Sequence, residues 1–128
     1  MCMVKKKRGD KTMKSLKEII SIYLKRLGIP ADVRGYAILK DAIELTINDA
    51  SYVRGVHKNL YVVLAKKYNV TTKNIERNIR YAIGKVALSV NRDLMKEIFS
   101  NTINPEKVKV TNVKFIATLS EYISMKEC

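Results

Sequence analysis

Four residues of one helical segment have side chains suited to contacting DNA. Glu76, Arg77, Arg80 and Tyr81 lie on the polar side of the stretch 60–90, which reads as two helices joined by a tight turn. A helix fits the major groove of B-DNA, where a guanidinium group donates two hydrogen bonds to O6 and N7 of guanine. The exposed side chains of such a helix must match base edges and phosphates. The alternative is that the arginines are ordinary surface charges of an amphipathic helix.

The elements that position these residues follow from the spacing of apolar side chains at three and four residues. This spacing predicts an all-α chain with helices over 14–27, 36–49, 56–68, 72–90, 92–99 and 112–124. Asn69 and Val70 form the predicted turn between the third and fourth helices. Thr71 or Thr72 caps the fourth helix, because a hydroxyl accepts a hydrogen bond from an unpaired backbone amide.

The apolar stripes predict which faces are buried. In the fourth helix, the inward residues are predicted to be Ile75, Ile79, Ala82, Ile83 and Val86. The opposite face of that helix carries Lys73, Arg77, Arg80, Tyr81 and Gly84. In the third helix, the inward residues are predicted to be Leu60, Val63 and Leu64.

The positive charge is concentrated in two places. The chain of 128 residues has a net charge of +13, and residues 1–17 (seven basic, one acidic) and 66–85 (six basic, one acidic) hold most of it. Local concentration of this kind favours a polyanion partner. We expect a basic flexible arm over 1–13, followed by a helix-turn-helix DNA-binding domain over 14–128. The arm could follow phosphates or enter a minor groove, or it could serve solubility alone.

Several function classes are disfavoured by the sequence. Cys2 and Cys128 have neither CxxC spacing nor a histidine cluster, so we expect no metal site, no structural disulfide and no cofactor. Free thiols suit a reducing cytoplasm. No apolar run reaches the ~20 residues that span a membrane, and the basic start is not followed by the apolar segment of a signal peptide. His57 is the only histidine, and no catalytic set surrounds it, so we expect no enzyme.

Three segments resemble a known family. GIPADVRGY (28–36), LAKKYNVTTKNIERNIRYAI (64–83) and FSNTINPEKVKVTNVKFIATLSEYI (99–123) are similar to the DNA-binding effector domain of the stage-zero sporulation response regulator of spore-forming Firmicutes. The similarity runs from about residue 16 to residue 123, with the same order and spacing of elements. It implies a bundle of six helices that binds double-stranded DNA at TGTCGAA-type boxes and activates or represses promoters.

The resemblance also implies roles for individual residues. Glu76, Arg77 and Arg80 match the base-reading positions, where Glu76 accepts from cytosine N4 or orients a neighbouring arginine. Apart from the resemblance, the positions near the turn and the helix N-terminus are expected to contact phosphate: Lys66, Lys67, Thr71, Thr72 and Lys73. Tyr81 is a further candidate for a phosphate contact, and the alternative is that it packs against the protein. Pairing as a homodimer on tandem boxes, and contact between the last helix and the RNA polymerase sigma subunit, follow from the resemblance alone.

The sequence departs from the family at three points. It has no receiver domain, it has Tyr81 where the family has histidine, and it has Gly84 where the family has a larger polar residue. The first difference puts phosphorylation control in doubt and suggests regulation by abundance or by a partner. From the Met1 start and the basic arm we expect a stand-alone protein, and the alternative is a domain cut from a longer regulator. Two other functions stay open: a protein-interaction module that binds RNA polymerase or a full-length regulator without reading DNA, and a non-specific DNA binder that depends on the arm.

Overall fold

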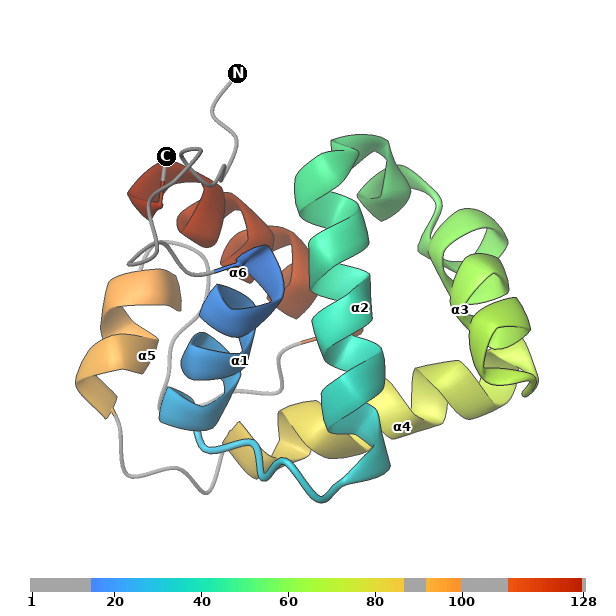
Figure 1. The fold of residues 1–128 in the computed structure, drawn as a ribbon, viewed down its shortest axis with the longest axis horizontal. Helices are drawn as coiled ribbons and strands as arrows, with labels where there is room; N and C mark the ends of the chain where they lie inside the picture. Colours follow the sequence, from blue (N-terminus) through green and yellow to red (C-terminus); the bar gives the residue numbers. More distant parts are fainter. Residues whose placement is uncertain (1–14, 87–91, 100–110, 128) are drawn as a thin grey trace.

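The computed structural model describes residues 15–86, 92–99 and 111–127 (Figure 1). All regular elements in these ranges are helical, which confirms the predicted all-α class. The elements are α1 (Leu16–Arg26), α2 (Arg34–Asn48), η1 (Ala50–Arg54), η2 (Val56–Leu60), α3 (Tyr61–Tyr68), α4 (Thr72–Val86), α5 (Arg92–Phe99) and α6 (Asn112–Lys126). The predicted arm (1–13), the first residue of the predicted helix 14–27 and the end of the predicted fourth helix (87–90) lie outside the described residues.

Helix α2 lies in the middle of the bundle and organises it (Figure 1). It packs against α1, α3, α4 and α6, and its side chains Leu39, Ala42 and Ile43 are fully buried. Helix α3 lies on one side of α2, while α5 lies on the other side beyond α1 (Figure 1). The bundle therefore has two separated flanks, joined by α4 and α6.

Local signals explain the bounds of α1. Ser15 Oγ accepts from the backbone N–H of Glu18, and the Glu18 carboxylate accepts from the backbone N–H of Ser15, which together form a capping box. Gly28 ends the helix in the left-handed region with a φ of 96°, and Pro30 cannot continue it.

Helix α2 begins two residues before the predicted Tyr36, at Arg34. Gly35 is buried against α4: a Cβ atom added there would lie 2.1 Å from the backbone oxygen of Asn78. Only glycine permits so close an approach of two helices. Its place in the first turn of α2 therefore fixes how that helix crosses α4.

The predicted third helix over 56–68 is divided in the structure. A π turn, Val56–Leu60, precedes α3, and η1 precedes that turn. The prediction that Val63 faces inward is wrong: Val63 is exposed, whereas Tyr61 is buried. The wider π turn shifts the register, so that Tyr61 joins Leu60 and Leu64 in the core.

The remaining helices agree closely with the predicted ranges. The inward stripe of α4 is buried as predicted. In α5 and α6 the buried apolar residues are Leu94, Met95, Ile98, Phe99, Phe115, Ile116, Leu119 and Ile123, whereas Met125 near the end of α6 is exposed. Thr111 caps α6 by accepting from the backbone N–H of Lys114, and α6 continues two residues beyond the predicted end. In the ranges that the structure describes, no helix is long and apolar enough to cross a membrane.

Candidate nucleic-acid interface

A tight turn connects α3 to α4. Asn69 ends α3 in the left-handed region with a φ of 55°, and Val70 donates its backbone N–H to Ala65 at 3.0 Å. Thr71 then caps α4, because its hydroxyl accepts from the backbone N–H of Asn74 at 3.0 Å. Of the two predicted caps, the structure thus selects Thr71. These contacts fix the direction in which α4 leaves the turn.

The outer face of α4 is basic and open to solvent. Lys73, Arg77 and Arg80 are exposed on it, opposite the buried stripe, as predicted. Lys66, at the end of α3, and Thr72 are exposed beside the turn. The candidate base-reading and phosphate-contacting residues therefore gather on α3, the turn and α4. That this surface contacts DNA stays a prediction.

Glu76 and Arg80 form an ion pair on this face. Arg80 Nη1 donates to Glu76 Oε1 at 2.7 Å, across one turn of α4. An exposed pair at this spacing stabilises a helix by only about 0.3–0.5 kcal/mol. Its main effect is to limit the conformations of Arg80. The guanidinium group has five N–H donors, so after bonding to Glu76 it can still donate to a second acceptor.

Sequence reasoning missed a contact from α6 to the same region. Asn112 Nδ2 donates to the hydroxyl of Tyr61 at 3.0 Å and to the backbone oxygen of Glu76 at 3.1 Å. The first residue of α6 therefore connects α3 with α4. Burial raises the pKa of Tyr61, while the hydrogen bond from Asn112 lowers it to a smaller extent. The polar residue that follows the cap Thr111 was the one available sequence signal.

The two lysines at the end of α3 differ in their surroundings. Among the described residues, no ion pair involves Lys66, whereas Lys67 Nζ lies 2.9 Å from Asp41 Oδ2 in α2. Asp41 also accepts a hydrogen bond from the hydroxyl of Tyr68. Sequence reasoning considered Asp41 only as one of several scattered aspartates that suggest no metal site, and assigned it no partner. Its position next to the core residues Ala42 and Ile43 was the signal that it is buried.

Tyr81 and Gly84 occupy the outer face of α4 toward its C-terminal end. Tyr81 is 57% exposed, so it does not pack in the core, and Lys85 Nζ lies 4.7 Å from the centre of its ring. An added Cβ at Gly84 would meet no atom within 4 Å. The two departures from the family pattern thus lie on open surface.

A family comparison decides the class of the chain. The model of the family described as "Sporulation initiation factor Spo0A C terminal" matches residues 20–123, which include α2 to α5 and most of α1 and α6. The chain belongs to this family. It is a DNA-binding effector domain of the sporulation-regulator type. The Spo0A C-terminal match includes the turn, the exposed arginines of α4 and the contact from α6.

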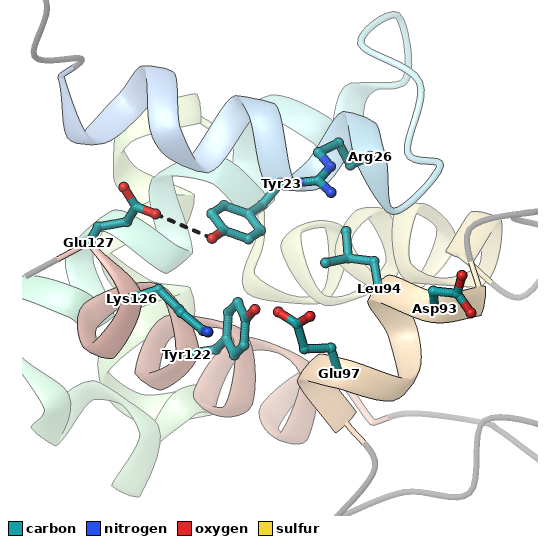
Figure 2. A pocket seen from close by; sticks show the side chains of 8 residues that line it. All are labelled: Tyr23, Arg26, Asp93, Leu94, Glu97, Tyr122, Lys126 and Glu127. Atoms are coloured by element: carbon teal, nitrogen blue, oxygen red, sulfur yellow. Dashed lines mark hydrogen bonds between the residues drawn. The ribbon is translucent and has the colours of Figure 1, made fainter.

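A second feature of this Spo0A C-terminal domain is a pocket away from α3. Its volume is about 490 Å³, and Figure 2 shows the side chains that line it. The lining residues come from α1, α5 and α6: Tyr23, Arg26, Asp93, Leu94, Glu97, Tyr122, Lys126 and Glu127. The Tyr23 hydroxyl donates to Glu127 at 3.3 Å, and the Tyr23 and Tyr122 rings meet edge to face. The pocket is therefore polar and carries both signs of charge.

Proposed function

We propose that this chain is a sequence-specific transcription regulator that reads TGTCGAA-type boxes in double-stranded DNA through α4. The observation that carries the proposal is the pair Arg77 and Arg80, both exposed on α4 opposite its buried stripe. Each guanidinium group can donate two hydrogen bonds to a guanine. The family match supports DNA binding, and the box sequence comes from the resemblance.

The turn supplies the anchoring contacts in this mechanism. Lys66, Thr72 and Lys73 are exposed around the N-terminus of α4, where backbone amides and the helix dipole also favour phosphate. The hydroxyl of Thr71 accepts from Asn74 and keeps its own proton for a phosphate oxygen. Tyr81 contacts the backbone further along the groove. Such contacts set the register of the helix without reading sequence.

Glu76 contributes by holding Arg80. The ion pair between them supports the second of the two roles that the sequence left open, in which the carboxylate orients an arginine. Holding the guanidinium in place before binding lowers the entropy cost of forming base contacts. By the same family resemblance, two copies occupy tandem boxes, and α6 contacts the RNA polymerase sigma subunit.

The proposal is tested by comparing the wild type with Arg77→Ala and Arg80→Ala. Binding to a TGTCGAA-type duplex and to a scrambled duplex is measured at two salt concentrations. We expect the wild type to prefer the box, and each substitution to cost about 1–3 kcal/mol on the box.

The matched control is Arg26→Ala, which removes the same charge from the pocket flank. It should weaken both duplexes slightly and leave the preference unchanged. Equal, salt-sensitive binding of the wild type to both duplexes would contradict specific readout and leave a general polyanion binder.

A second candidate function is a protein-interaction module, and the pocket between α1, α5 and α6 favours it. The pocket includes the C-terminal end of α6, and its paired tyrosines and opposite charges suit a polar protein contact. Binding of the purified sigma subunit or a full-length regulator would then survive Arg77→Ala and Arg80→Ala. It would be lost with Glu97→Gln and Tyr122→Ala. The reverse pattern would exclude this candidate.

A further inference from the structure

Asp41 is a buried carboxylate with two partners that are neighbours in sequence. Asp41 lies in the middle of α2 and is only 7% exposed. Lys67 Nζ lies 2.9 Å from Oδ2, and the hydroxyl of Tyr68 donates to the same oxygen. We refer to Asp41, Lys67 and Tyr68 as the α2–α3 clasp. Each contact joins the middle of α2 to the last turn of α3.

The loss of either partner is costly for Asp41, whereas Lys67 itself is about half exposed. A buried carboxylate that loses a partner keeps its desolvation penalty without compensation. Tyr68 also stays neutral, because burial and then the hydrogen bond to Asp41 raise its pKa. The last turn of α3 is therefore held to α2, and the next residue, Asn69, begins the turn into α4.

The same helix also sets the position of α4. Gly35, six residues before Asp41, presses the first turn of α2 against Asn78. Six helical residues correspond to about 9 Å along the axis. α2 thus fixes the end of α3 through Asp41 and the middle of α4 through Gly35, and the turn is held between these two points.

The clasp also separates the roles of two adjacent lysines. Lys66 points its charge to solvent, with no ion pair among the described residues, while Lys67 already neutralises Asp41. Movement of Lys67 to a phosphate would leave Asp41 with Tyr68 alone. The free energy lost with the Lys67–Asp41 ion pair would offset the free energy gained from a phosphate contact.

We propose that Asp41 is a positioning residue for DNA readout, and that Lys67 pairs with Asp41 and does not contact a DNA phosphate. In this proposal Asp41 acts through Lys67 and Tyr68 on the turn that aims α4. The part that concerns readout rests on the proposed function. The part that concerns Lys67 requires only that the chain binds DNA, and it revises the sequence-based assignment of Lys67 to phosphate.

The test compares Lys67→Met with its neighbour Lys66→Met in the full chain. Both changes remove one charge and keep most of the side-chain stem. Binding to the box and scrambled duplexes is measured over a range of salt concentrations. The salt slope is the steepness with which the logarithm of the binding constant falls with the logarithm of the salt concentration. We expect Lys66→Met to make this slope shallower by about 0.9 on both duplexes, as for one lost phosphate contact. We expect Lys67→Met to leave the slope unchanged and to lower the box preference about fivefold, the lower end of the loss of one base contact.

Asp41→Asn should change the salt slope in the opposite direction. It releases Lys67 but keeps an acceptor for Tyr68. The salt slope on the scrambled duplex should therefore become steeper by about 0.9, while the box preference falls. In denaturant unfolding, Asp41→Asn combined with Lys67→Met should destabilise by less than the sum of the single changes. A purely structural role for Asp41 would move the unfolding midpoint and leave the salt slope unchanged.

The outcomes separate the two proposals. If Lys67→Met lowers the salt slope as Lys66→Met does, Lys67 contacts phosphate and the clasp proposal is overturned. Additive unfolding effects of the Asp41 and Lys67 changes overturn it as well. If the wild type shows no box preference, the proposed function fails, and the slopes on the scrambled duplex still decide the role of Lys67.

Discussion

Glu76 and Arg80 illustrate how little of this surface is needed for stability. Their ion pair is exposed and within reach of salt, so it contributes only about 0.3–0.5 kcal/mol to folding. The clasp residue Asp41 is the opposite case, since it is buried and has two partners. The exposed charges of α4 thus contribute little to folding, while the buried Asp41 joins α2 to the end of α3.

The tyrosines give a prediction for alkaline pH. Burial raises the pKa of Tyr61, and burial together with Asp41 raises the pKa of Tyr68, above the ordinary value of 10.0. Above pH 10 the unfolded chain therefore loses these protons before the folded chain does, and stability that is complete below this pH falls as the pH rises.

We expect the free energy of unfolding to fall more steeply above pH 10 in the wild type than in Tyr68→Phe. Denaturant unfolding at a series of pH values from neutral to alkaline measures this difference. Lysine titration is common to both proteins and cancels in the comparison. Parallel curves for the two proteins would show that Tyr68 keeps an ordinary pKa in the folded state.

At the scale of elements, α2 and α6 both contact the helices that carry the candidate nucleic-acid interface. α2 holds the end of α3 through the clasp and approaches α4 at Gly35. α6 begins at Asn112, which bonds to Tyr61 and Glu76, and it ends beside the pocket, where Glu127 bonds to Tyr23. The candidate nucleic-acid interface and the pocket therefore both contact α6.

Two helical glycines should respond to alanine with opposite signs. Gly84→Ala places a methyl group in open space on α4 and should stabilise the fold by about 0.5–1 kcal/mol, because glycine is a poor helix former. Gly35→Ala forces a methyl group into the backbone of Asn78 and should destabilise by about 1–3 kcal/mol. Thermal unfolding of the two variants measures both effects. A loss of stability in Gly84→Ala would mean that its surroundings are more crowded than the structure shows.

At the scale of the whole molecule, the excess positive charge lies on α3, the turn and α4 and not at the pocket. Residues 66–85 carry six basic residues and one acidic residue, whereas the pocket mixes three carboxylates with two cations. Under the proposed function, this charge distribution favours approach of DNA to the surface formed by α3, the turn and α4, away from the pocket. Figure 1 shows α3 and α5 on opposite sides of the bundle.

Removal of residues 1–13 tests the contribution of the basic arm. The segment holds five basic residues and one acidic residue, so its loss should weaken binding to both duplexes and flatten their salt dependence. The preference for the box should survive, because the base-reading candidates lie on α4. Gel-shift titrations of both duplexes check this expectation. If truncation abolished binding altogether, non-specific binding through the arm would be the better description.

The sequence alone determined the features that depend on near neighbours. The stripe of isoleucines on α4, the turn at Asn69 and the polar cap before α4 are local patterns, because helix periodicity and capping act over three or four residues. The exposed face with Arg77 and Arg80 follows directly from that stripe. The family resemblance was also visible in three sequence segments, and the family match over residues 20–123 agrees with it.

Only the tertiary structure decided which distant residues meet. Tyr68 bonds to Asp41 across 27 positions, and Asn112 bonds to Tyr61 across 51. No periodicity links such pairs, because their contact depends on how whole helices cross. The error at Val63 lies in the same region: a π turn precedes α3, and Tyr61 rather than Val63 is buried beside Leu60 and Leu64. Local spacing determines what each helix can present, and helix packing decides which of those groups are bound within the fold and which stay free for a partner.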